Sequence, residues 1–173
     1  KSFVVAILAI SIAQNIDKHV LLIVCDMRLP SIQKMFGFGP VPGLSDYLNQ
    51  GTPLPSLMCR TFFERLTILP GGSTPPNPAE LLSSGRMTDL LREVSQRYND
   101  RFIIIDTPPI QLTAEAQALA KFTEGVILVV RLGSSNKKLA ANIINKIGRD
   151  KLIGVVGNFA EKHASNGGYA GKY

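Results

Sequence analysis

Two aspartates follow runs of β-forming residues, and both runs have the composition of buried parallel strands. Residues 20–25 are all apolar and end at Asp26, and residues 102–105 are all apolar and end at Asp106. An apolar run of this length, bounded by polar residues or proline, is typical of a strand buried on both faces. Open α/β sheets bind their ligands at the carboxyl ends of such strands. The two carboxylates together predict a phosphate-and-metal site, whereas either Asp alone could simply cap a following helix or turn.

A Lys-Ser pair opens the sequence, one helix before the strand that ends at Asp26. Lys1 and Ser2 match the last two residues of G-x-x-x-x-G-K-[ST], although the dipeptide alone is common. In a P-loop site, main-chain N–H groups cradle phosphates and the Lys1 ammonium neutralises the β- and γ-phosphates. The Ser2 hydroxyl and Asp106 would ligate Mg²⁺, with Asp26 on the metal's water shell or near the γ-phosphate. We therefore predict an Mg-ATP site with Lys1, Asp26 and Asp106 as catalytic residues and Ser2, Asp26 and Asp106 as metal ligands.

The elements that must position these residues alternate between strand and helix, which predicts an α/β domain with a doubly wound parallel sheet. We expect this domain to span residues 1–160 and a flexible tail with Gly and Tyr to span 161–173. Because the sequence begins at Lys1 and not at Met, we expect the P-loop glycines and the strand before them to be missing from it. The predicted helices are Ser2–Gln14, 31–36, 44–49, one that begins at Pro78 after Asn77 as N-cap, 87–98, 114–121 and Lys137–Ile147. The predicted strands are 20–25, 66–70, 102–106, 125–131 and Leu152–Asn158.

Composition narrows the classes of function. The net charge of +6 favours an anionic partner, such as nucleic acid, anionic lipid or nucleotide. No interleaving of aromatic and basic residues accompanies it, so we do not expect nucleic acid. Two cysteines are too few for a disulfide framework and favour reduced thiols. His19 and His163 have no partner at metal-ligand spacing, so we expect them at the surface. The apolar segment 3–13 could be a signal-peptide core, but a helix buried against the sheet explains it equally.

Four segments together resemble the bacterial tyrosine autokinases (BY-kinases) of exopolysaccharide and capsule export, which are relatives of the MinD/ParA-type ATPases. Lys1-Ser2 is similar to the end of a Walker A motif, residues 20–30 to the additional Walker A′ motif, and residues 102–109 to Walker B. Residues 69–82, LPGGSTPPNPAELL, are similar to the family's LPxGxxPPNPxELL segment and are the most specific of the four. The resemblance covers nearly the whole chain and implies a P-loop NTPase domain of the deviant-Walker type that binds ATP and Mg²⁺.

The resemblance also implies a reaction, in which the γ-phosphate of ATP is transferred to tail tyrosines of a neighbouring subunit. Tyr169 and Tyr173 are the candidate acceptors, although two tyrosines in a polar tail are unremarkable by themselves. Arg28 is a further candidate for cofactor binding, and we expect it to orient the Asp26 loop or to meet a neighbouring subunit and not to act as an arginine finger. Asn158 is implied to contact adenine, with a helix cap or turn as the simpler alternative. The implied partners are further copies in a ring and a membrane polysaccharide co-polymerase that activates the kinase. The implied location is the cytoplasmic face of the plasma membrane.

The sequence departs from the family at the A′ motif, which usually reads D-x-D-x-R. Here Val24 replaces the first Asp of that pattern, before Asp26 and Arg28. A tyrosine hydroxyl has a pKa near 10 and needs a base to accept its proton, which Val cannot do. Three functions follow: a kinase in which Asp26 is the base, a nucleotide-sensing module without transfer, or a MinD/ParA-type partitioning ATPase. The proline-rich segment and the tail tyrosines count against the third.

Overall fold

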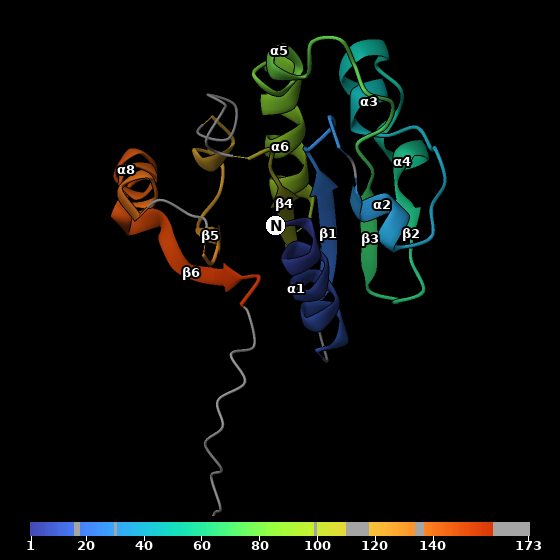
Figure 1. Ribbon diagram of the computed structural model, residues 1–173. Coiled ribbons are helices and arrows are strands. Elements are labelled where there is room, and N and C mark those ends of the chain that lie inside the picture. The colour runs from blue at the N-terminus through green and yellow to red at the C-terminus, as the bar shows by residue number, and fades with distance from the viewer. Residues whose placement is uncertain (16–17, 30, 99, 110–117, 134–136, 161–173) are drawn as a thin grey trace, which may run out of the picture.

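Two groups of strands carry the fold (Figure 1). The computed structural model describes residues 1–15, 18–29, 31–98, 100–109, 118–133 and 137–160. The first sheet has the order β2-β3-β1-β4, with β1, β3 and β4 parallel and the short β2 antiparallel at the edge. The remaining strands, β5 and β6, form a parallel pair. The strands are β1 (His19–Val24), β2 (Cys59–Arg60), β3 (Leu66–Leu69), β4 (Arg101–Asp106), β5 (Val126–Arg131) and β6 (Leu152–Asn158).

Helices cover both faces of the four-stranded sheet because the buried side chains of β1 alternate in direction. Leu21 and Ile23 pack into a core with α3, α4, α5 and α6, while Leu22 packs into a second core with α1 and α2. A sheet covered on both faces confirms the predicted doubly wound α/β architecture. The helices are α1 (Ser2–Gln14), α2 (Ser31–Met35), α3 (Leu44–Gln50), α4 (Leu54–Leu57), α5 (Pro78–Leu82), α6 (Gly85–Arg97), α8 (Lys137–Ile147) and the 3₁₀ helix η1 (Arg149–Lys151).

Helix α1 packs close to the sheet through small side chains. Ala6, Ala9 and Ala13 recur three and four residues apart and are all buried, which places them on one face of the helix. They share the second core with Val20 and Leu22 of β1. The interpretation of the apolar segment as a helix packed on the sheet is therefore confirmed. Within the described ranges, no helix has both the length and the apolar character needed to cross a bilayer.

Several details of the helices and strands differ from the prediction. α6 begins at Gly85, two residues earlier than expected, because the Ser84 hydroxyl accepts a hydrogen bond from the Met87 amide at 3.2 Å and caps the helix. α5 begins at Pro78 as predicted, but the Asn77 side chain makes no cap bond and instead donates to Glu80 at 2.8 Å. The antiparallel strand β2 was not predicted. The first half of the expected helix 114–121 lies outside the described residues, and residues 118–120 are helical.

The proline-rich loop after β3 is fastened to α3 by main-chain hydrogen bonds. The Leu44 amide donates to the Pro70 carbonyl at 2.7 Å, and the Ser45 amide donates to the Gly71 carbonyl at 3.1 Å. Gly72 adopts a φ of 79°, a left-handed conformation that glycine tolerates best. The segment that is most specific in the sequence therefore leaves the carboxyl end of β3 in a fixed path.

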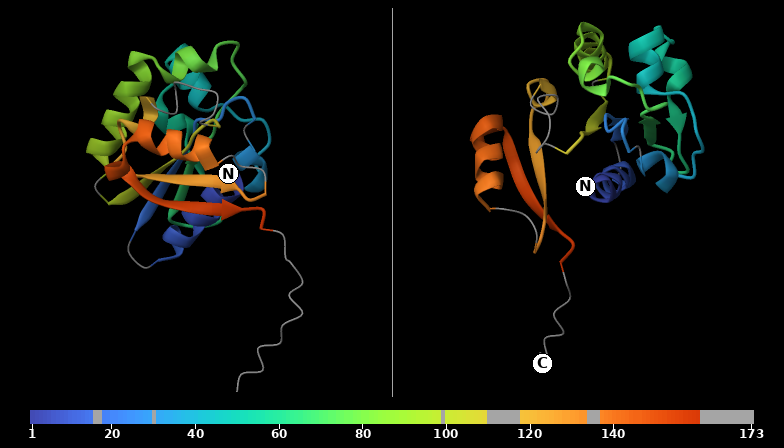
Figure 2. Two further views of the ribbon diagram at one scale, coloured as in Figure 1. Left: turned by 60° about the vertical axis from the view of Figure 1, so that its left-hand side comes forward. Right: turned by 45° about the horizontal axis from the view of Figure 1, so that its top comes forward.

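Strands β5 and β6 lie beside the four-stranded sheet without joining it. The described residues of β4 and β5 share no ladder, so the strands form two sheets where one continuous sheet was expected. Figure 2 shows β5, β6 and α8 next to the larger sheet from two sides. The space between β4 and β5 contains the cavity described below.

Candidate active site

The two predicted aspartates meet because their strands are neighbours in register. Val24 of β1 pairs with Asp106 of β4, and the Cys25 amide continues the ladder by donating to the Asp106 carbonyl at 2.8 Å. Asp26 follows directly at the carboxyl end of β1. Adjacent parallel strands thus deliver both carboxylates to one edge of the sheet.

Lys1, the residue before α1, and Ser2, the first residue of α1, reach the same edge. The Lys1 ammonium lies 2.6 Å from Asp106 Oδ1 and 3.4 Å from Asp26 Oδ2. The Ser2 hydroxyl donates to Asp106 Oδ2 at 2.9 Å. Both oxygens of Asp106 therefore have a partner, which a carboxylate with 1% exposure requires. The structure brings together all four residues that were predicted to bind phosphate and metal.

The interior beside this cluster is poorly solvated. Burial raises the pKa of the Cys25 thiol well above its usual range, and the nearby Asp106 carboxylate raises it further. Cys25 therefore stays a neutral thiol, and it is not a candidate nucleophile. Electrostatic interactions at this edge of the sheet are correspondingly stronger than in bulk water.

The donor set at this edge fits Mg²⁺. A hydroxyl from Ser2 and carboxylates from Asp26 and Asp106 are hard oxygen ligands, and Mg²⁺ typically takes one or two carboxylates together with substrate phosphates. Within the described ranges, no three His, Cys, Asp or Glu side chains gather to hold a metal ion by themselves, so this site would need oxygen ligands from the substrate as well. The cluster can therefore hold an Mg²⁺ ion that a triphosphate completes.

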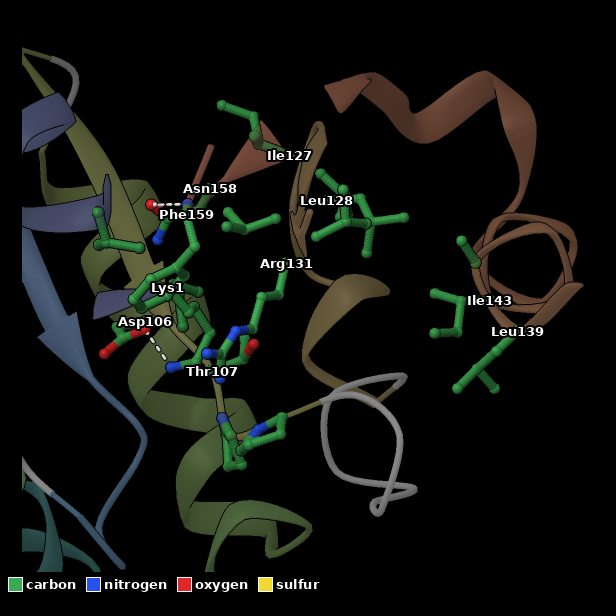
Figure 3. Close-up of a pocket in the computed structure, with 18 residues that line it drawn as sticks. Lys1, Asp106, Thr107, Ile127, Leu128, Arg131, Leu139, Ile143, Asn158 and Phe159 are labelled. Carbon is green, nitrogen blue, oxygen red and sulfur yellow. Dashed lines mark hydrogen bonds and ion pairs between the residues drawn. The ribbon is translucent and has the colours of Figure 1, made fainter. Parts of the chain in front are cut away.

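A cavity of about 470 Å³ opens beside this cluster, between β4 and β5. Figure 3 shows its polar end, where Lys1 and Asp106 lie near Arg131, Asn158 and Phe159. This volume is typical of small-molecule sites. The sequence analysis singled out Asn158, which lines the cavity. It missed Phe159 and Arg131 as site residues, and their position at the ends of the last two strands is a signal that could have found them.

Other predicted residues lie away from this cavity or outside the described ranges. Arg28 is exposed in the loop after β1 and is not among the residues that line the cavity. Val24 is fully buried and packs into the core with α1 and α2. His19 is exposed at the start of β1, as expected. Tyr169, Tyr173 and His163 lie outside the described residues.

Comparison with known proteins places this arrangement in a family, although no protein-family model matches the chain. The tyrosine-protein kinase YwqD of Bacillus subtilis is 35% identical over 176 residues, which cover 99% of this chain and 73% of YwqD. The kinase domain of the Escherichia coli tyrosine kinase ETK superposes with a TM-score of 0.83 at 29% identity, covering 99% of this chain and 67% of that one. The chimerical protein CapA2B2 superposes with a TM-score of 0.81 at 33% identity, covering 93% and 71%. These relatives share the sequence and fold of a chain that brings two strand-end carboxylates to the lysine before α1, and the chain belongs to the bacterial tyrosine-protein kinases.

Proposed function

We propose that this chain binds Mg-ATP at Lys1, Ser2, Asp26 and Asp106 and transfers the γ-phosphate to tyrosine. The observation that carries the proposal is the convergence of the Lys1 ammonium and the Ser2 hydroxyl on the buried Asp106, beside Asp26. Membership of the tyrosine-protein kinases supports the reaction class.

Each residue has a role that follows from its chemistry. Ser2 and Asp106 would hold Mg²⁺, with Asp26 directed at its water shell. Bound Mg²⁺ supplies positive charge that neutralises the phosphate oxygens during transfer. The Lys1 ammonium, which contacts two carboxylates in this structure, can turn to the β- and γ-phosphate oxygens because its side chain is 26% exposed. Asp26 is the nearest carboxylate that could accept the proton of a tyrosine hydroxyl.

A second candidate function rests on Val24. This residue occupies the register position opposite Asp106 and is fully buried. Its side chain is a hydrocarbon, so it has no oxygen that could bind a metal or accept a proton. If the first carboxylate of the A′ motif is the essential base, the chain binds Mg-ATP without transferring phosphate. It would then be a nucleotide-sensing module that controls assembly with a partner.

The assembly and the acceptors are further proposals that family membership supports. We infer that Tyr169 and Tyr173 accept phosphate from a neighbouring copy in a ring. We also infer that a membrane polysaccharide co-polymerase activates the kinase at the cytoplasmic face of the membrane and thereby regulates exopolysaccharide export. Native mass spectrometry with and without Mg-ATP tests self-association, and a monomer under both conditions would exclude the ring.

Calorimetric titration with ATP tests the binding site. We expect binding that requires Mg²⁺ and weakens at least about tenfold in Asp106→Asn, because this change removes the charge of a ligand that Mg²⁺ prefers. Asp89→Asn is the matched control, since Asp89 is exposed on α6 and makes only a surface ion pair. Binding that is independent of Mg²⁺, or equal in Asp106→Asn and wild type, would contradict the proposed site.

A further inference from the structure

The last two strands end side by side at the polar end of the cavity. Arg131 of β5 pairs in register with Asn158 of β6, and the Leu132 amide donates to the Asn158 carbonyl at 2.8 Å. Phe159 follows directly. These residues line the same cavity as Lys1 and Asp106 (Figure 3), so the cavity offers a place for the base of a nucleotide whose phosphates lie at Lys1.

Phe159 is held in an unfavourable backbone conformation. Its φ of 59° is the only positive φ of a non-glycine residue within the described ranges. A side chain in this left-handed region costs free energy, because its Cβ crowds the following carbonyl. The Asn158 amide oxygen accepts a hydrogen bond from the Phe159 amide at 2.8 Å and so supports this conformation. Strain of this kind persists where the surrounding structure imposes it and often marks a binding site.

Core packing does not explain the strain, because the ring stays at the surface. Phe159 is 62% exposed, and its ring contacts the Arg131 guanidinium, whose central carbon lies 4.7 Å from the ring centroid. An exposed aromatic ring backed by a guanidinium offers a flat, rigid face. Nucleobases stack on such faces irrespective of their hydrogen-bonding pattern.

We propose that Phe159, supported by Arg131, is the stacking surface for the nucleobase of the bound triphosphate and favours purines, whose two fused rings present more stacking area than the single ring of a pyrimidine. The inference rests on the proposed function, since it concerns the base of the same nucleotide. Asn158 supplies the directional contact. Its amide oxygen is occupied by the Phe159 amide, so its amide nitrogen remains as a donor to the acceptor nitrogens of a purine edge.

The test compares ATP with inorganic tripolyphosphate, which has the phosphates and no base. We expect Phe159→Leu to weaken ATP binding about tenfold and to leave tripolyphosphate binding unchanged, because only the base touches the ring. Phe159→Tyr keeps an aromatic face and should bind ATP like wild type. Phe62→Leu is the control, since Phe62 is almost fully exposed and lies outside the cavity. We also expect wild type to prefer ATP to UTP and Phe159→Leu to reduce that ratio.

The outcomes separate this inference from the proposed function. If wild type binds ATP and Phe159→Leu binds it equally well, the stacking surface is refuted while the phosphate site stands. If Phe159→Leu loses ATP and tripolyphosphate to the same extent, the residue acts on the fold or on the phosphate end, which also refutes stacking. If wild type binds neither ligand, the proposed function itself fails, and the inference fails with it.

Discussion

The ion pair between Lys1 and Asp106 should show a strong asymmetry between its two partners. Asp106 is 1% exposed, whereas the Lys1 side chain is 26% exposed. Lys1→Met leaves a buried carboxylate without its nearest cation, and the chain cannot easily expose that carboxylate to water. Asp106→Asn leaves an ammonium that can turn toward solvent or toward Asp26. The lysine change should therefore destabilise the fold more than the aspartate change does.

The size of this destabilisation can be worked out from the distance between the two charges. Two unit charges 2.6 Å apart attract by about 6 kcal/mol at an effective dielectric constant of 20. The desolvation of both groups offsets most of this attraction, while removal of one partner from a buried pair costs about 3–5 kcal/mol. Because Lys1 is partly exposed, we expect the free energy of unfolding to fall by about 3 kcal/mol in Lys1→Met and by about 1.5 kcal/mol in Asp106→Asn. The loss of stability in the double variant should be about 2 kcal/mol smaller than the summed losses of the two single variants.

Urea unfolding of wild type, both single variants and the double variant measures this coupling free energy. The surface pair Arg92–Asp89 is the matched control, because its side chains are 60% and 70% exposed, and its coupling should stay below about 1 kcal/mol. If the losses of stability in Lys1→Met and Asp106→Asn simply add up in the double variant, the reasoning is refuted. Equal coupling in the two pairs would refute it as well.

Three further predictions concern other parts of the fold. Gly72→Ala should destabilise the fold by about 2–4 kcal/mol in urea unfolding, because the new Cβ would meet Ser45 Oγ and the Asp46 carboxylate at a left-handed φ. Gly37→Ala has a similar φ and open space, so it should cost only about 1–2 kcal/mol; equal losses would contradict the packing argument. Lys151→Met should cost about 1–2 kcal/mol in the same assay, because the ammonium donates to three main-chain carbonyls at 2.9–3.1 Å; an unchanged free energy would mean that water replaces it. Iodoacetamide should label Cys59 in the folded protein and label Cys25 only after unfolding, because Cys25 is fully buried while Cys59 is partly exposed; rapid labelling of Cys25 in the native state would contradict this.

Much of the fold could be predicted because its signals are local. Apolar runs that end at Asp26 and Asp106 predicted β1 and β4, and the alternation of strand and helix segments predicted α8 between the last two strands. The meeting of Asp26 and Asp106 could also be anticipated, because parallel neighbouring strands deliver their ends to one edge. Lys1 and Ser2 could be placed beside them only through their match to the end of a Walker A motif.

Other features depend on tertiary contacts that a linear pattern does not contain. The two-residue strand β2 exists only because β3 offers an edge to it. Phe159 reads as an ordinary residue after a strand, and its left-handed backbone and its contact with Arg131 become visible only in three dimensions. The burial of Val24 opposite Asp106 is likewise a matter of register between two distant segments.

Phosphotyrosine mapping by mass spectrometry, after incubation of the protein with Mg-ATP, tests the central claim most directly. The account predicts phosphate on tyrosine, with Tyr169 and Tyr173 as the expected sites, and loss of that phosphate in Asp106→Asn. Wild type that binds Mg-ATP and carries no phosphotyrosine, together with a Val24→Asp variant that does carry it, would contradict the claim. It would show that Val24 has converted a kinase into a nucleotide-binding module.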